Sequence, residues 1–100
     1  MDEYNVILSS CARSDFHDVI DHMNILPPEA ATRSFDFFME KMAFLEASPN
    51  SSPLARDAQL RLRGYRLFPV DNYIVFYVIR GNVVEIRRIL YARRQYERLF

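Results

Sequence analysis

Residues 61–100 combine arginine with tyrosine, two residue types whose side chains can together bind RNA. The candidates are Tyr65, Arg66, Tyr73, Tyr77, Arg87, Arg88, Tyr91, Arg93, Arg94 and Tyr96. Arginines neutralise phosphates and aromatic rings stack on bases, which are the ingredients of single-stranded RNA recognition. Attack by a ribose 2′-hydroxyl on a phosphate also needs charge stabilisation, which arginines can supply, and groups that move protons, a role that a tyrosine beside a cation can fill in part. Metal-independent RNA cleavage is therefore one candidate activity.

The charge of the chain is divided between its two parts. Residues 1–60 contain four basic and ten acidic side chains, a balance of −6, whereas residues 61–100 contain nine basic and three acidic ones, a balance of +6. Such an asymmetry indicates a polyanionic or an acidic protein partner. Twelve of the thirteen basic residues are arginine. Arginine suits bidentate phosphate contacts, although genome composition is an alternative reason for its excess.

Other kinds of chemistry have little support in the sequence. His17 and His22 are five residues apart, about 140° around a helix, so they do not share a face as metal ligands should. The chain has two separated glycines and therefore no glycine-rich phosphate loop, and no serine lies in a nucleophile-elbow sequence. We expect no metal and no small-molecule cofactor.

The 100 residues are enough for one domain, which we place at residues 1–100. Half of the residues are hydrophobic, but no apolar run approaches the roughly 20 residues of a membrane span. The N-terminal sequence does not resemble a signal peptide, and the single Cys11 fits a reducing compartment. The expectation is a cytoplasmic protein without a membrane partner.

Hydrophobic periodicity predicts a strand, two helices and then three strands. Residues 4–8 are strand-like, and apolar residues at helical spacing follow over 12–23. Pro28 suits the start of a second helix, whose apolar stripe is Ala31, Phe35, Phe38, Met42 and Leu45. Residues 48–53 form a loop.

Three strands are predicted beyond this loop, as an antiparallel meander. They cover residues 60–70, 73–79 and 83–91, and Gly81-Asn82 forms the hairpin turn between the last two. Gly64 and Pro69 indicate a bend or an edge in the first of them. Residues 93–100 form a short helix or a tail. The fold class is therefore α+β, with a single, mostly antiparallel sheet and the helix pair packed on one face.

Simple alternation assigns the side chains of the last strand to two faces of the sheet. It places Arg87, Ile89 and Tyr91 on one face, and Arg88 and Leu90 on the other.

The element order and several short segments resemble the RelE/ParE superfamily of toxins from type II toxin–antitoxin systems. The segments are GYR (64–66), NYIVFY (72–77), VEIRRILY (84–91) and ARRQY (92–96), together with the opening YNVILSSCARSDF. The resemblance implies a toxin held inactive by a cognate antitoxin, commonly a small protein whose disordered segment folds over the toxin. RelE-type members cut mRNA on the ribosome, whereas ParE-type members inhibit DNA gyrase without cleaving RNA.

The resemblance also implies roles for individual residues. It implies catalytic roles for Arg66, Arg93, Arg94 and Tyr96. If the sheet binds RNA, the residues expected to contact it are Arg63, Tyr65, Arg87, Arg88 and Tyr91. Two positions depart from the RelE-type pattern, because Phe68 and Ile74 stand where basic residues are often found. Messenger RNA cleavage is the first interpretation, gyrase inhibition is the alternative, and a toxin that has lost its activity is a third.

Overall fold

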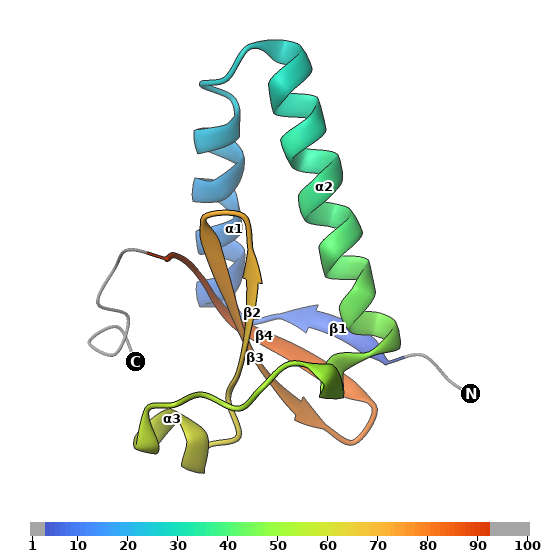
Figure 1. The fold of residues 1–100 in the computed structure, drawn as a ribbon, viewed down its shortest axis with the longest axis vertical. Coiled ribbons are helices and arrows are strands. Elements are labelled where there is room, and N and C mark those ends of the chain that lie inside the picture. The colour runs from blue at the N-terminus through green and yellow to red at the C-terminus, as the bar shows by residue number, and fades with distance from the viewer. Residues whose placement is uncertain (1–3, 93–100) are drawn as a thin grey trace.

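The computed structural model of the chain describes residues 4–92 and forms one four-stranded sheet with a helix pair on one face (Figure 1). The elements are β1 (Asn5–Leu8), α1 (Ser10–Met23), α2 (Pro28–Ala47), the short 3-10 helix η1 (Pro49–Ser51), α3 (Ala58–Leu62), β2 (Arg66–Val70), β3 (Tyr73–Arg80) and β4 (Val83–Tyr91). The strand order is β1-β4-β3-β2. β1 runs parallel to β4, and the other pairs are antiparallel. The predicted α+β class and the meander are confirmed.

The main core lies between the helix pair and the sheet. Val19 of α1 and Phe38 and Leu45 of α2 pack there with Tyr77 and Ile86 of the sheet, and all five side chains are at most 2% exposed. Burial of this kind contributes about 1.5–3 kcal/mol for each large apolar side chain. The periodic pattern of the two helices therefore predicted which of their faces meets the sheet.

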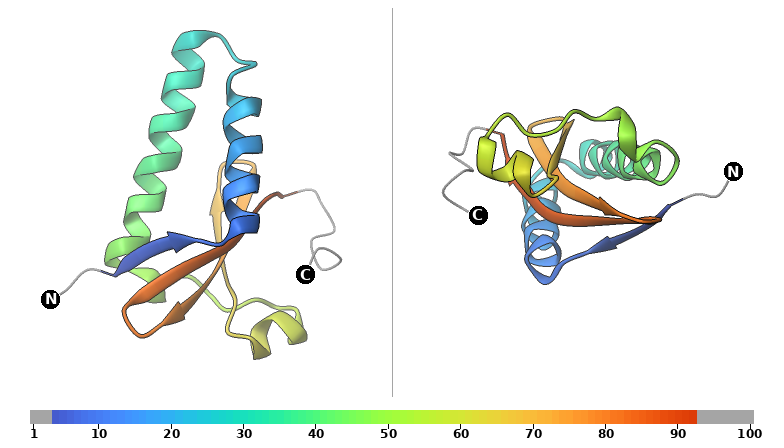
Figure 2. Two further views of the ribbon diagram at one scale, coloured as in Figure 1. Left: turned by 180° about the vertical axis from the view of Figure 1, so that it is seen from behind. Right: turned by 90° about the horizontal axis from the view of Figure 1, so that it is seen from below.

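One residue of the predicted apolar stripe is exposed, whereas Ala31 and Met42 are half-buried and Phe38 and Leu45 are buried. Phe35 is 39% exposed. The helix pair extends beyond the end of the sheet, as both Figure 1 and the left view of Figure 2 show. The first turns of α2 therefore have α1 beside them but no strand beneath them, and a side chain at this height remains at the rim of the core.

A second core covers the opposite face of the sheet. It contains the buried side chains of Ala55, Leu60, Tyr65, Phe76, Val78 and Leu90. The first three belong to residues 52–65, which fold across the strands and include α3; the right view of Figure 2 shows this segment beside the sheet. Both faces of the sheet are therefore covered.

The predicted strand over 60–70 is wrong in its first part. Residues 58–62 form α3, whose first turn is capped because Asp57 accepts a hydrogen bond from the Leu60 N–H at 3.0 Å. Gly64, with a φ of +81°, then reverses the chain before β2 begins at Arg66. Pro69 lies on β2, which is an edge strand of the sheet as its proline indicated.

Candidate functional site

The structure describes only some of the candidate residues predicted from the sequence. Arg63, Tyr65, Arg66, Arg87, Arg88 and Tyr91 lie in the described part of the chain, whereas Arg93, Arg94 and Tyr96 lie outside the described residues. The contacts of the first group decide how much of the predicted RNA-binding sheet is accessible.

A bulge in β4 fixes where its arginines lie. Tyr77 pairs with Ile86 and Phe76 pairs with Arg88, so Arg87 is an extra residue on β4. A bulge places its two residues on the same side of a sheet, and the Arg87 guanidinium indeed lies 5.9 Å from the Tyr65 ring centre in the second core. The predicted alternation is therefore wrong: Arg87 does not share a face with Ile89, which belongs to the main core.

The bulge lies at the point where β1 ends and α1 takes its place beside β4. Leu8 is the last residue of β1 to pair with β4, opposite Ile86. Ser9 then donates its N–H to the Ile86 carbonyl at 2.9 Å and its hydroxyl to the Arg87 carbonyl at 3.0 Å. The same hydroxyl accepts the Ala12 N–H at 3.1 Å, which caps α1.

Arg88 forms a partly buried ion pair with Asp15 of α1. Its Nε and Nη2 atoms donate to the two Asp15 carboxylate oxygens at 2.7 and 3.1 Å, and the two side chains are only 20% and 11% exposed. The hydrogen bond to Asp15 raises the pKa of Arg88 above its already high ordinary value. Because two nitrogen atoms of the Arg88 guanidinium are bonded to the Asp15 carboxylate, Arg88 has a structural role and is not available to a phosphate.

Arg66 and Tyr77 are likewise engaged with the loop that follows α2. The Arg66 Nη1 atom donates to the Ser52 carbonyl at 2.5 Å, and the Tyr77 hydroxyl donates to the Pro49 carbonyl at 2.5 Å. Burial raises the pKa of Tyr77, and a hydrogen bond with Ser52 and the charge of Arg66 only partly oppose this. Tyr77 therefore remains a neutral hydrogen-bond donor near pH 7, as expected for a structural residue.

The remaining sheet residues differ in accessibility. Tyr65 is only 4% exposed, so its ring cannot stack on a base without unfolding the second core. The Arg87 guanidinium lies beside this ring and donates to Glu85 at 2.9 Å. Arg63, at the C-terminal cap of α3, is exposed. Within residues 4–92 its side chain makes no hydrogen bond or ion pair.

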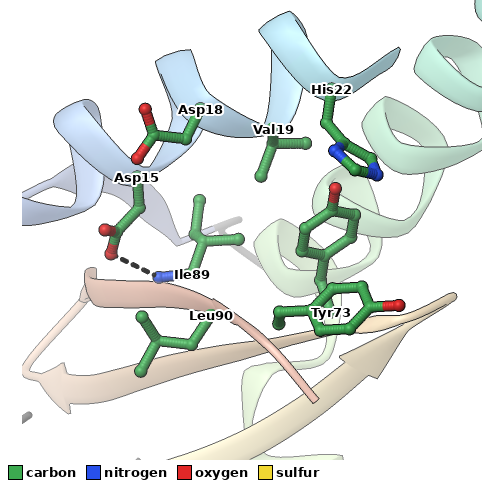
Figure 3. Close-up of a pocket in the computed structure, with 8 residues that line it drawn as sticks. Asp15, Asp18, Val19, His22, Tyr73, Ile89 and Leu90 are labelled. Carbon is green, nitrogen blue, oxygen red and sulfur yellow. Dashed lines mark hydrogen bonds between the residues drawn. The ribbon is translucent and has the colours of Figure 1, made fainter. Parts of the chain in front are cut away.

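A cavity of about 270 Å³ lies between α1 and the last residues of β4 (Figure 3). Its lining residues are Asp15, Asp18, Val19, His22, Tyr73, Ile89, Leu90 and Tyr91. The Tyr73 and Tyr91 rings meet edge to face at 5.9 Å, and burial together with Tyr91 raises the pKa of Tyr73. Of the two carboxylates in this lining, Asp15 is paired with Arg88, whereas Asp18 forms no ion pair within residues 4–92. None of the described lining residues is arginine or lysine, so the cavity offers a phosphate backbone no cation and is poorly suited to RNA.

The described residues contain neither a cluster of metal-ligand side chains nor a membrane-spanning helix. No group of three or more histidine, cysteine, aspartate or glutamate side chains in 4–92 is placed to hold a metal ion. Over the same residues, no helix has both the length and the apolar character to cross a membrane.

The fold and its strand order are those of solved structures from a ParDE and a RelBE toxin–antitoxin system. The chain belongs to the ParE toxin family of type II toxin–antitoxin systems, whose family model (ParE toxin of type II toxin-antitoxin system, parDE) matches residues 6–96. The recognition made from the sequence is thereby confirmed. No curated protein matches the chain.

Two of the solved structures that share this fold come from toxin–antitoxin systems. One belongs to the chromosomal ParDE toxin–antitoxin system from P. aeruginosa, with a TM-score of 0.72 and 18% identity, covering 91% of this chain and 98% of that one. The other belongs to the RelBE2 toxin–antitoxin complex from Mycobacterium tuberculosis, with a TM-score of 0.57 and 21% identity, covering 89% and 98% of the two chains.

Proposed function

We propose that this toxin arrests growth by inhibiting DNA gyrase through protein contact, without cleaving RNA, and that a cognate antitoxin neutralises it. The observation that carries the proposal is the engagement of one predicted catalytic residue and of predicted RNA-binding residues within the fold. Arg66 is hydrogen-bonded to the Ser52 carbonyl in the loop after α2, and Arg88 is paired with Asp15 of α1. Tyr65 is buried. Membership of the ParE family supports the same target.

The covered sheet also argues against a nuclease site on physical grounds. A catalytic arginine must reach the phosphate whose charge it stabilises, and freeing Arg88 would leave the Asp15 carboxylate partly buried without its counter-ion. Tyr73 and Tyr77 have raised pKa values, so neither is a suitable general base near neutral pH. Inhibition by surface contact requires none of these groups.

The proposed antitoxin partner is supported by the two solved structures similar to this chain, because both come from toxin–antitoxin systems. Co-expression of the toxin with the protein encoded beside it should restore growth and yield a complex that survives gel filtration. A toxin that still arrests growth in the presence of every neighbouring product would contradict this part of the proposal.

The proposed target is tested in cells that express the toxin alone. Plasmid supercoiling and the integrity of abundant messages are measured in the same culture after induction. The proposal expects relaxed plasmids, or plasmids with trapped gyrase cleavage, and intact messages. New mRNA ends within codons at early times, with supercoiling unchanged, would instead favour ribosome-dependent cleavage. Arg93, Arg94 and Tyr96 would then be the residues to test.

A further inference from the structure

One side of α2 carries aromatic residues that the fold leaves in solvent. Phe37 is 39% exposed and Phe44 is 47% exposed, and they are seven residues apart on the helix. Phe44 stacks on Phe68 of β2 at 6.1 Å, and the Lys41 ammonium lies 5.3 Å from the Phe37 ring centre. This side is opposite to Phe35, which lies towards Ile20 and Met23 of α1. Figure 1 shows α2 beside α1, with α1 on one side of it only.

The residues on this outer side follow the spacing of a helix that pairs with another helix. They alternate at intervals of three and four positions: Ala30, Arg33, Phe37, Glu40, Phe44 and Ala47. All of them are exposed or half-buried. The two partly exposed rings, Phe37 and Phe44, leave apolar area in solvent along one line of the helix, and contact with another protein surface would bury it.

We propose that this stripe is a self-association surface, on which α2 packs antiparallel to α2 of a second copy around a two-fold axis at Phe37. When two copies of the stripe run in opposite directions, residues of the stripe face residues of complementary size or charge on the other copy. Ala30 and Phe44 are equally distant from Phe37, so the small side chain of one copy lies against the large ring of the other. A two-fold interface of this kind uses the same patch on both chains.

The charges of the stripe match in the same arrangement. Arg33 and Glu40 lie almost symmetrically about Phe37, so each arginine meets the glutamate of the other copy. Both charged residues lie on the same side of the aromatic line, about 30–50° around the helix from it. Neither forms an ion pair within residues 4–92. Lys41 lies on the other side of that line, where it does not oppose Arg33.

Charge exchange provides a test that leaves the fold intact, because the exchanged side chains are exposed. The molar mass of the toxin, purified away from its antitoxin, is measured by sedimentation equilibrium over about 1–500 µM. The wild type should move from 11.9 kDa towards twice that mass. Glu40→Arg and Arg33→Glu each bring like charges together, and each should weaken self-association by at least about tenfold.

The double variant Arg33→Glu/Glu40→Arg should restore association to within about threefold of the wild type, since it re-forms the pair with reversed sign. Asp36→Arg is the matched control, because Asp36 is exposed on α2 but lies about 100° around the helix from Phe37. It should associate as the wild type does. A wild type that remains at 11.9 kDa throughout, or a double variant that fails to recover, would overturn the proposal.

An antitoxin that covers this stripe is the competing outcome. If Glu40→Arg weakens antitoxin binding while the isolated wild type stays monomeric, the surface belongs to the antitoxin and the proposal is wrong. The test does not depend on the cellular target, because association is measured on purified toxin and gyrase is absent. Failure of the gyrase proposal would therefore leave this result unaffected.

Discussion

The Asp15 carboxylate fastens α1 to the open edge of β4 by accepting hydrogen bonds from the Arg88 Nε atom at 2.7 Å and the Ile89 backbone N–H at 2.9 Å. β1 pairs with β4 only as far as Ile86, and beyond that point the Asp15 carboxylate accepts the backbone hydrogen bond that a neighbouring strand would otherwise accept. The same contact converts Arg88 from a candidate RNA ligand into a structural residue. It joins residues 73 positions apart in the sequence.

Replacement of Asp15 tests the structural role of this contact. Asp15→Ala leaves a partly buried guanidinium and a strand N–H without their acceptor, and should lower the free energy of unfolding by about 2–4 kcal/mol. Asp18→Ala is the matched control, because Asp18 is exposed one turn further along α1, and its effect should be within about 0.5 kcal/mol. Urea unfolding followed by circular dichroism measures both. Equal stability of the two variants would contradict the structural role.

Arg66→Ala distinguishes a structural arginine from a catalytic one. Loss of its bond to the Ser52 carbonyl should lower the free energy of unfolding by about 1–3 kcal/mol. If Arg66 is structural, the Arg66→Ala variant should lose toxicity only because it unfolds, so its toxicity should return at a lower temperature at which the variant is folded. Arg63→Ala, on the exposed cap of α3, should be as stable as the wild type. An Arg66→Ala protein that is fully folded and inactive at every temperature would instead indicate a direct role in the toxic activity.

Two tyrosines make the stability of the fold sensitive to high pH. Burial raises the pKa values of Tyr73 and Tyr77 in the folded state above the ordinary 10.0, so the unfolded chain loses these protons first. Their contribution is therefore fully present below pH 10 and is lost as the pH rises through the folded-state values. The midpoint of urea unfolding should fall above about pH 10. Tyr77→Phe should lower the midpoint at pH 7 but make this alkaline decrease shallower.

Much of the fold could be predicted because it follows from local pattern. The spacing of Phe38 and Leu45 gave the buried side of α2, and Gly81-Asn82 marked the turn between β3 and β4, where Gly81 has a φ of +60°. The helix α3 was missed because five residues are too few to show a helical period. Asp57, three residues before Leu60, was the signal that could have revealed its start.

The site was harder to predict because its contacts join distant segments. Nothing near Arg88 in the sequence indicates that Asp15 is its partner, and nothing near Tyr65 indicates that residues 52–65 fold over the sheet. The bulge at Arg87 also cannot be read from alternation, because a single extra residue changes the faces of those that follow. The resemblance of several short segments to a known superfamily therefore identified the toxin family, whereas the long-range contacts changed the interpretation of its arginines.

The most direct test of the proposed target is a supercoiling assay with purified DNA gyrase and toxin freed of its antitoxin. Relaxed plasmid, gyrase and ATP are incubated with increasing toxin, and the antitoxin complex at equal concentration serves as the control. The proposal predicts that the free toxin stops supercoiling or traps cleaved DNA and that the complex does not. Unimpaired supercoiling at saturating toxin, together with cleaved mRNA on translating ribosomes, would contradict it.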